Sequence, residues 1–320
     1  MAVLVTGAAG FIGSHLVDAL LTREDMVIGA DNLSRGKIGH LAGALASGRF
    51  VLIRLDLADE AQVRERLEPV VARHQVGAIW HLAANSDIAA GQAEASIDLR
   101  DTFLSTCRMV ALARRRGIAQ FGFTSTSAVY GEWFGALREE GPASKPISNY
   151  GAMKLASEAA LNAALTEGLS RAVVFRLPNV VGARATHGVI VDLLTRLKTN
   201  RRRLPVLGDG RQRKPYLHVR ELIDAMLYIW ERAAGRSVCF NIGPADEGAT
   251  VAEIAAQVMR AAGVQATIEY TGGTRGWSGE VARFHYCIDK LTALGWRPRQ
   301  SSSAAIAQAC AEVAEEVGPW

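Results

Sequence analysis

The segment VLVTGAAGFIGSHL, close to the N-terminus, constrains the fold more than any other part of this 320-residue chain. Its three glycines, Gly7, Gly10 and Gly13, separate a short apolar run from a segment of helical periodicity. Glycines at this spacing allow a tight turn between a strand and a helix, and a close approach of the backbone to a ligand. The segment therefore predicts a strand, a turn and a helix whose first amide groups can bind an anion.

The same alternation continues through the first half of the chain. Short runs rich in β-branched and aromatic residues predict strands at Ala2–Thr6, Met26–Ala30, Phe50–Leu55, Ala78–Leu82, Phe121–Ser125 and Ala172–Leu177. Segments of helical periodicity lie between them, at Phe11–Leu21, Glu60–Ala72, Phe103–Arg115 and Tyr150–Thr166. Near-continuous apolar strands that alternate with amphipathic helices predict an α/β fold, a doubly wound parallel sheet with helices on both faces.

The periodicity loosens beyond about residue 180, where short strands and helices are joined by loops around Gly208–Pro215 and Thr271–Gly279. The chain is long enough for one large domain or two moderate ones. We predict a nucleotide-binding Rossmann domain over residues 1–178, with a return segment around residues 215–242. Residues 179–320 are predicted to form a smaller, interleaved α/β domain that binds the substrate.

A carboxylate at the end of the second predicted strand indicates which dinucleotide the glycine turn would bind. At this position Asp31 can accept hydrogen bonds from an adenosine ribose and repel a 2′-phosphate. Arg35 and Lys37 lie nearby and could hold such a phosphate, but Asp31 outweighs them. We therefore predict NAD rather than NADP as the cofactor, the alternative being a structural glycine turn without a cofactor.

Residues at the ends of the third and fourth predicted strands are further candidates. Asp56 can reach an adenine amino group, or it can instead cap the N-terminus of the helix at Glu60–Ala72. We interpret His81, which ends the fourth strand, as a packed residue and assign it no chemistry. Small or apolar residues beside which a nicotinamide nucleotide can lie follow it; they are Leu82, Ala83 and Ala84.

Tyr150 and Lys154 lie four residues apart in SNYGAMKLASE, at the start of a predicted helix. In isolation such a pair is an ordinary helical turn with a half-buried tyrosine and a solvated lysine. Here the helix begins at the carboxyl edge of the sheet, where the hydroxyl-rich segment TSTSAVYGE also ends a strand and where ligands bind. The context favours a functional pair over an ordinary turn.

Hydride transfer to or from an alcohol requires a group that moves the hydroxyl proton. Tyrosine has a reference pKa of about 10, so acting as a base near pH 7 requires stabilising the phenolate by about 4 kcal/mol. The Lys154 ammonium, one helical turn away, and a positively charged nicotinamide can supply this stabilisation in a poorly hydrated site. The pair therefore predicts a proton-transfer site.

These motifs, taken in order, resemble those of the extended short-chain dehydrogenase/reductases in the nucleotide-sugar epimerase/dehydratase family. The matching segments cover nearly the whole chain: VTGAAGFIGSHL, Asp31-Asn32-Leu33, Asp56-Leu57, HLAA, STSAVYG, YGAMK, RLPNVVG and LGDGRQRKPYLHV. The resemblance implies three catalytic residues: Tyr150 as the base, Lys154 as the holder of the nicotinamide ribose, and Thr126 as the hydroxyl that binds the reacting group. The cofactor contacts then expected are Gly7, Gly10, Phe11, Ile12, Gly13, Asp31, Asn32, Asp56, Leu57, Leu82, Ala83, Ala84, Tyr150, Lys154 and Pro178.

On the substrate side, the resemblance implies that Asn179, like Thr126, contacts the substrate, here at its diphosphate. Lys214 replaces an arginine that is usual in the family, and it is cationic but not bidentate. Trp277 holds the position of a second phosphate arginine, so Arg275 is the candidate for that task. Phe284 aligns with the residue that walls the sugar 2-substituent in 4-epimerases, or it only packs within its domain.

Two further departures from the family lie near the predicted nicotinamide site. Asp98 stands where the family usually has asparagine, and Asp101-Thr102 stands where it usually has glycine and threonine. A contact on the nicotinamide side is therefore not carried over from the family to this chain.

The residues after Thr126 distinguish members of the family. Sugar 4,6-dehydratases carry aspartate and glutamate there, and UDP-glucuronate decarboxylases carry a glutamate at the position of Ala128; this chain has Ser127 and Ala128. The resemblance thus implies an isomerase, a 4-epimerase that acts on a UDP-hexose through a transient 4-keto intermediate. Alternatives are UDP-glucuronate 4-epimerisation, with Arg184 at the carboxylate, another dehydrogenase or dehydratase reaction on a nucleotide sugar, and a non-enzymatic dinucleotide sensor.

Composition and charge limit the kinds of partner that the chain can bind. With 49% hydrophobic and 21% charged residues the chain is globular, and a net charge of +4 suits a small anionic substrate. The basic run Lys198–Arg203 is too narrow for nucleic acid. Four scattered cysteines show no metal-ligand spacing, and neither a signal peptide nor a membrane span is seen, which favours a cytoplasmic protein without metal. The family also implies a homodimer through Phe103–Arg115 and Tyr150–Thr166, unless both helices pack only on their own sheet.

Overall fold

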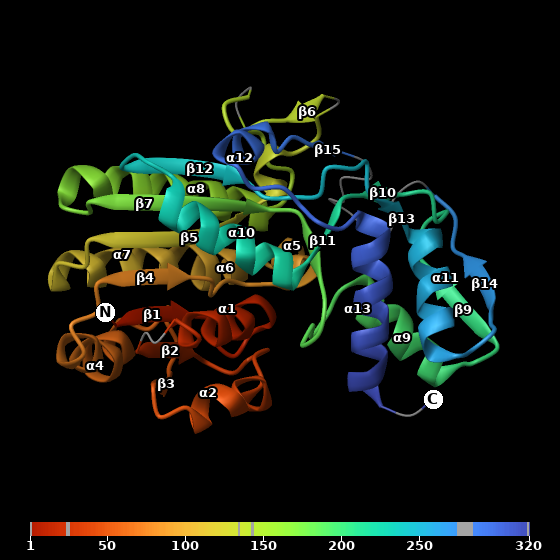
Figure 1. Cartoon of the computed structure of the whole chain (residues 1–320), viewed down its shortest axis with the longest axis horizontal. Coiled ribbons are helices and arrows are strands. Elements are labelled where there is room, and N and C mark those ends of the chain that lie inside the picture. The colour runs from red at the N-terminus through yellow and green to blue at the C-terminus, as the bar shows by residue number, and fades with distance from the viewer. Residues whose placement is uncertain (1, 24–25, 134, 142–143, 274–283, 319) are drawn as a thin grey trace. The chain divides into compact units, whose positions relative to one another are not determined.

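A seven-stranded sheet dominates the first part of the chain (Figure 1). Its strands are β1 (Val3–Thr6), β2 (Val27–Asp31), β3 (Phe50–Arg54), β4 (Ala78–His81), β5 (Gln120–Thr126), β7 (Arg171–Leu177) and β12 (Ser237–Asn241). They follow the order β12-β7-β5-β4-β1-β2-β3, and β1 pairs in parallel with both β2 and β4. Because the strand order reverses at β1, a ligand is expected at the carboxyl ends of β1 and β4. The predicted doubly wound parallel sheet is confirmed.

The computed structural model describes residues 2–23, 26–133, 135–141, 144–273, 284–318 and 320. The chain divides into two units. The first comprises residues 1–131, 142–176 and 227–240, and the second comprises residues 132–141, 177–226 and 241–320. The assignment of one unit to the cofactor and the other to the substrate stays a prediction. Within the described ranges, no helix is both long and apolar enough to cross a membrane.

The helices of the first unit flank its sheet (Figure 1). They are α1 (Phe11–Leu21), α2 (Ala42–Ala46), α3 (Glu60–Gln62), α4 (Glu68–Arg73), α5 (Ile88–Ala93), α6 (Ala95–Asp98), α7 (Ser105–Arg116), α8 (Asn149–Ala164) and α10 (Val219–Arg232), the last of which continues from the second unit. One π-helical turn, η2 (Val63–Leu67), joins α3 to α4, and another, η3 (Leu99–Leu104), joins α6 to α7.

The helix predicted at Phe103–Arg115 begins much earlier than expected, at Ala95, where α6 starts. The reason is the π-helical turn η3, which contains one more residue per turn than an α-helix needs. Such a turn shifts the spacing of the apolar residues, so the 3.6-residue period that predicts an α-helix is interrupted there. The earlier start places Asp98 on a helix that precedes the π-helical turn.

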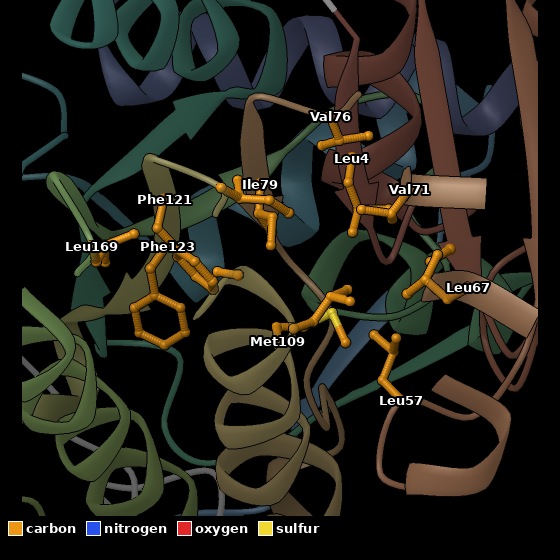
Figure 2. Packing of buried hydrophobic residues seen from close by; sticks show 14 of the residues in the cluster. Leu4, Leu57, Leu67, Val71, Val76, Ile79, Met109, Phe121, Phe123 and Leu169 are labelled. Carbon is orange, nitrogen blue, oxygen red and sulfur yellow. The ribbon is translucent and has the colours of Figure 1, made fainter. Parts of the chain in front are cut away.

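One face of the sheet packs on α4, α7 and α8. Figure 2 shows this cluster, in which Leu4, Ile79 and Phe121 of three strands lie among Leu67 of η2 and Met109 of α7. All five side chains are fully buried. Burial of each such side chain stabilises the fold by about 1.5–3 kcal/mol. The alternation along β4 then places His81 on the same face as Ile79, toward α7 and α8.

The other face of the sheet packs on α10 through aromatic rings. Trp80 of β4 stacks on Phe175 of β7 with 5.7 Å between ring centroids, and lies 4.4 Å from the ring of Trp230 in α10. Gly122 of β5 makes room for them, because a Cβ there would lie 3.1 Å from Trp80 and 3.2 Å from Trp230. A bare backbone at this position lets three large rings share one sheet face.

The second unit is built from helices and short strand pairs. Its helices are α9 (Val189–Thr199), α11 (Val251–Ala262), α12 (Asp289–Leu294) and α13 (Ser302–Val317). Its strands are β6 (Ala136–Leu137), β8 (Asn179–Val181), β9 (Arg203–Val206), β10 (Arg213–Lys214), β11 (Tyr216–His218), β13 (Ala249–Thr250), β14 (Thr267–Tyr270) and β15 (His285–Tyr286). Buried residues of α9, α11 and α13, among them Leu194, Ile254 and Ala309, form a core separate from that of the first unit.

Candidate active site

The glycine turn after β1 has the geometry that a bound pyrophosphate requires. Gly7 has a left-handed φ of +66°, and a Cβ there would lie 2.9 Å from the backbone nitrogen of Ala83. A Cβ at Gly13 would lie 2.0 Å from the carbonyl oxygen of Gly7. Gly10, which has no side chain, occupies the N-cap of α1, so the amides of its first turn remain available to an anion. The cradle fits a dinucleotide pyrophosphate.

Asp31 ends β2 beside this turn and is held by backbone amides. Its Oδ2 accepts a hydrogen bond of 2.9 Å from Ala9, and its Oδ1 accepts one of 2.8 Å from Leu33. Burial raises the pKa of Asp31, while these amides oppose the rise. Arg35, one of two cations that could hold a 2′-phosphate, instead forms an ion pair with Asp87. The surroundings of Asp31 therefore suit a ribose hydroxyl better than a phosphate.

The alternative that Asp56 caps the following helix is wrong. The helix begins at Glu60 with Asp59 as its N-cap, and the Asp59 carboxylate accepts a hydrogen bond of 3.2 Å from the backbone of Gln62. Asp56 instead closes a turn by accepting from the backbone of Ala58, and it forms an ion pair with Arg100. The turn moves the helix start beyond the reach of Asp56, whose contact with adenine stays a prediction.

The fully buried His81 is engaged by both of its ring nitrogens. Nε2 lies 3.1 Å from the hydroxyl of Thr106, which itself donates to the carbonyl of Thr102, and Nδ1 lies 2.7 Å from the hydroxyl of Thr6. These hydrogen bonds together fix a neutral imidazole ring with the proton on Nε2. Burial lowers the pKa of His81 to about 3, with the Lys154 charge as a further cause. The geometry gives His81 a structural role.

The same Thr6 hydroxyl orders the backbone that follows β4. It accepts hydrogen bonds from the amides of Leu82, at 3.1 Å, and Ala83, at 3.2 Å. This segment is the one that approaches Gly7 most closely. Among the other cofactor candidates, Leu57 is buried in the core, and Asn32 accepts a hydrogen bond from the backbone of Ser34. Their contacts with the cofactor stay predictions.

Tyr150 and Thr126 are brought together at the carboxyl end of β5. Tyr150 stands in the first turn of α8, where the Ser148 side chain caps the helix, and its hydroxyl shares a hydrogen bond with Thr126. Thr126 ends β5, and its hydroxyl oxygen also accepts from the amide of Ala128 at 3.2 Å. A tyrosine and a threonine hydroxyl that already share a hydrogen bond can together bind one alcohol of a substrate.

Lys154, one helical turn further along α8, is only 2% exposed. Its Nζ donates a hydrogen bond of 2.6 Å to the carbonyl oxygen of Thr124 and lies 5.9 Å from the ring centroid of Tyr150. Burial lowers the pKa of Lys154 to about 7, against the opposing charges of Glu158 and Asp98. Lys154 is therefore held under the end of β5.

The prediction that Lys154 and a positive nicotinamide together stabilise the phenolate of Tyr150 stays a prediction. Burial raises the pKa of Tyr150 to about 12, the charge of Asp98 raises it further, and the hydrogen bond from Thr126 opposes the rise. Lys154 is itself buried, which lowers its own pKa to about 7, and its Nζ is bonded to the carbonyl oxygen of Thr124. The positive nicotinamide is then the charge that must favour the phenolate.

A buried ion pair that the motifs did not predict lies behind Lys154. Arg176 of β7 donates to Glu158 of α8 through Nη2 at 2.7 Å and through Nε at 3.1 Å, and to the hydroxyl of Tyr130 at 2.8 Å. Ser125 of β5 also donates to Glu158. Through these hydrogen bonds Glu158 joins α8 to β7 and to β5, one helical turn beyond Lys154. An arginine within the apolar run VVFRL is the sequence signal that could have revealed it.

Of the predicted substrate residues, Asn179, Lys214 and Phe284 belong to the second unit, whereas Thr126 ends β5 in the first. Asn179 begins β8, and its Nδ2 donates to the carbonyl of Pro215 at 3.2 Å. Lys214 lies half-buried in β10, and the half-buried ring of Phe284 meets that of Tyr286 edge to face at 6.1 Å. The segment that holds Arg275 and Trp277 lies outside the described residues, and Pro178 follows β7 directly. Their contacts with a substrate stay predictions.

Comparison with known proteins agrees with this site. Residues 3–243 match the NAD dependent epimerase/dehydratase family. A UDP-glucose 4-epimerase from Mycolicibacterium smegmatis is 30% identical over 315 residues, which cover 96% of this chain and 97% of that protein.

Solved structures share the fold over nearly the whole chain. A UDP-galactose 4-epimerase has a TM-score of 0.86 and 31% identity, covering 99% of this chain and 100% of that one. A UDP-glucose 4-epimerase from Thermus thermophilus, solved in complex with NAD, has a TM-score of 0.84 and 29% identity, covering 98% of each. The resemblance seen in the motifs is thereby confirmed. The chain belongs to the NAD dependent epimerase/dehydratase family and is an enzyme whose cofactor is NAD.

Proposed function

We propose that the chain is an isomerase, a nucleotide-sugar 4-epimerase that acts on a UDP-hexose. The observation that carries the proposal is the hydrogen-bonded pair of Tyr150 and Thr126 at the end of a strand that continues with Ser127 and Ala128. Such a site can move one hydroxyl proton, and Ser127 and Ala128 hold the two positions at which a carboxylate would be needed to eliminate water. Relatives named UDP-glucose 4-epimerase and UDP-galactose 4-epimerase support the same reaction.

The residues of the chain divide the work of the reaction. Thr126 orients the 4-hydroxyl of the sugar, and Tyr150 takes its proton and later returns a proton to the same oxygen. Lys154 holds the ribose beside them. Bound NAD would supply an acceptor for the hydride of the sugar carbon that can also return it. Because the 4-ketone is planar at that carbon, a turn of the sugar lets hydride return to the opposite face and inverts the centre.

The reaction is tested with a substrate that carries deuterium at the sugar 4-carbon. We expect both epimers to keep the label without exchange with solvent, because the hydride never leaves the site. The sugars to compare are UDP-glucose, UDP-galactose and UDP-glucuronate, since the last tests whether Arg184 accommodates a carboxylate. NADH that accumulates in proportion to product would identify a dehydrogenase and overturn the proposal.

Phe284 is predicted to limit the size of the sugar 2-substituent. An acetamide needs space for several more atoms than a hydroxyl, and overfilling a packed site costs about 1–3 kcal/mol. We expect the wild type to prefer UDP-glucose over UDP-N-acetylglucosamine by roughly 5–150-fold in kcat/KM. Phe284→Ser should accept the larger sugar, whereas Phe284→Tyr, which keeps the ring, should not. Equal kcat/KM for both sugars in the wild type would show that Phe284 is no barrier.

We also propose that the chain forms a homodimer through α7 and α8. Met109, Leu112 and Leu161 of these helices pack on their own sheet, which accounts for one face of each. Leu99, in the π-helical turn before α7, is 52% exposed, and a partner chain on that side would cover it. Light scattering at micromolar concentration should report about twice the chain mass of 34.3 kDa. A stable species of one chain mass would contradict the dimer.

A further inference from the structure

A carboxyl group that the reaction does not use lies beneath the candidate active site. Asp98, the last residue of α6, is 0% exposed. Its Oδ1 accepts a hydrogen bond of 2.9 Å from Nδ2 of Asn85. Among the described residues, its Oδ2 is buried without a hydrogen-bond partner. One half of this carboxyl is therefore satisfied and the other half is not, which is costly for a charged group.

A bare backbone closes off the unsatisfied oxygen. A Cβ at Gly91 of α5 would lie 1.9 Å from Oδ2 of Asp98 and 3.0 Å from Nδ2 of Asn85. Gly91 is itself fixed to α8, because Asn149 donates a hydrogen bond of 2.9 Å to its carbonyl oxygen. The Cα of Gly91, which cannot donate a conventional hydrogen bond, therefore lies next to Oδ2 of Asp98. The surrounding elements hold the carboxyl in position without neutralising it.

The groups that face Asp98 include both members of the Tyr150 and Lys154 pair. Burial raises the pKa of Asp98, and the charge of Asp101 on its own helical segment adds to the rise, whereas the hydrogen bond from Asn85 and the Lys154 ammonium on α8 favour the charged form. Its charge in turn acts on the phenol of Tyr150 and on Lys154. The β4–α5 loop contributes Asn85, which also bonds the backbone carbonyl of Asp87.

Further charges are arranged around these groups. Glu158 acts on Lys154 from the next turn of α8, and His81 of β4 is held neutral. Asp87 is paired with Arg35. Asp101 is paired with Arg100. Asp98, in contrast, acts on both Tyr150 and Lys154, and it forms no ion pair among the described residues.

We propose that Asp98 is a positioning residue whose negative charge keeps a proton on Tyr150 and on Lys154, so that the base is released only when positive charge arrives with the cofactor. A negative charge opposes formation of a second one on the phenol and stabilises the ammonium. The usual asparagine of the family would have the same shape and no charge. In this chain, aspartate at position 98 in place of asparagine makes the protonation of Tyr150 depend on the other charges in the site, including that of the cofactor.

Asp98→Asn tests the proposal because it removes the charge and keeps the shape. The phenolate fraction of Tyr150 is read by NMR of ¹³Cζ-labelled tyrosine, with Tyr150→Phe to identify its signal, over the pH range in which the protein stays folded. A unit charge within about 10 Å at an effective dielectric constant near 20 shifts a pKa by roughly one unit. We expect Tyr150 in Asp98→Asn to titrate about one pH unit lower than in the wild type.

A matched control and a second variant make the result specific. Asp101→Asn removes a neighbouring carboxylate that is paired with Arg100, and it should leave the Tyr150 titration near that of the wild type. Asp98→Ser, a smaller neutral residue, should reproduce the shift if Asp98→Asn does not fold. An unchanged titration in the neutral Asp98 variant that folds, or an equal shift in Asp101→Asn, would overturn the proposal.

The activity measurement rests on the proposed function, whereas the NMR measurement does not. With a UDP-hexose and NAD, the acid limb of the kcat profile against pH should move about one unit lower in Asp98→Asn. If no sugar is turned over but the Tyr150 titration shifts, the proposed substrate is wrong and the role of Asp98 stands. If turnover is found but neither profile moves, the role of Asp98 is wrong.

Discussion

Replacing Tyr150 with phenylalanine is expected to lower kcat by roughly 10²–10⁴ while leaving NAD bound. The variant keeps the ring, which lies 5.9 Å from Nζ of Lys154, and removes only the hydroxyl that bonds Thr126. The proton of the sugar hydroxyl then has no positioned acceptor. Steady-state kinetics with a UDP-hexose measure the loss, and the absorbance of bound NAD(H) reports cofactor retention.

The pH dependence adds a second readout for the same variant. Because burial raises the pKa of Tyr150 to about 12, kcat/KM of the wild type should rise as pH increases, as more of the phenolate forms. Tyr150→Phe should lose this rise. Tyr228→Phe is the matched control, since Tyr228 is a half-buried tyrosine of α10 that contacts Arg232. Wild-type turnover by Tyr150→Phe would show that another group is the base.

Lys154→Ala is expected to lower kcat by roughly 10²–10³ and, unlike Tyr150→Phe, to weaken the retention of NAD. The buried ammonium is bonded to the carbonyl of Thr124 and stands one turn from Tyr150, so its removal leaves a polar cavity under the end of β5. Both turnover and the NAD content of the purified protein measure the effect.

The folded state of the lysine variant needs its own control. Burial lowers the pKa of Lys154 to about 7, below the value near 10.5 of an exposed lysine, so the unfolded chain binds this proton more tightly. The contribution of Lys154 to the free energy of unfolding of the wild type therefore increases as pH rises from about 7 toward 10.5. Lys154→Ala should lack this gain in thermal unfolding, whereas Lys198→Ala on the exposed end of α9 should keep it. Full NAD retention by Lys154→Ala would contradict its role at the ribose.

The strands and the glycine turn could be predicted from the sequence because their causes are local. Each of the six predicted strands has its last residue within one position of the last residue of the observed strand. A strand that is buried on both faces appears in the sequence as a continuous apolar run, so the end of the run marks the end of the strand. Gly7 and Gly13 were recognisable because only glycine tolerates the left-handed turn and the backbone contact found there. Tyr150 and Lys154 were recognisable because one helical turn brings them together.

What could not be predicted is either a local departure from helical periodicity or a contact between separate elements. The π-helical turn after Asp98 hid the start of its helix, and the ion pair of Glu158 and Arg176 joins a helix to a strand. The role of Asp59 as N-cap followed from a turn at Asp56 that the helical period does not reveal.

The sequence by itself determined the order of strands and helices, the glycine cradle, the carboxylate of Asp31 and the presence of the Tyr150 and Lys154 pair. The tertiary structure decided the protonation of that pair. A pKa depends on desolvation and on every charge nearby, and these come from elements far apart in the chain: the carbonyl of Thr124 on β5 binds Lys154, and Asp98 on α6 acts on Tyr150. Spacing in the sequence fixes which groups can meet, and only the packed fold fixes the dielectric and the charges in which they meet.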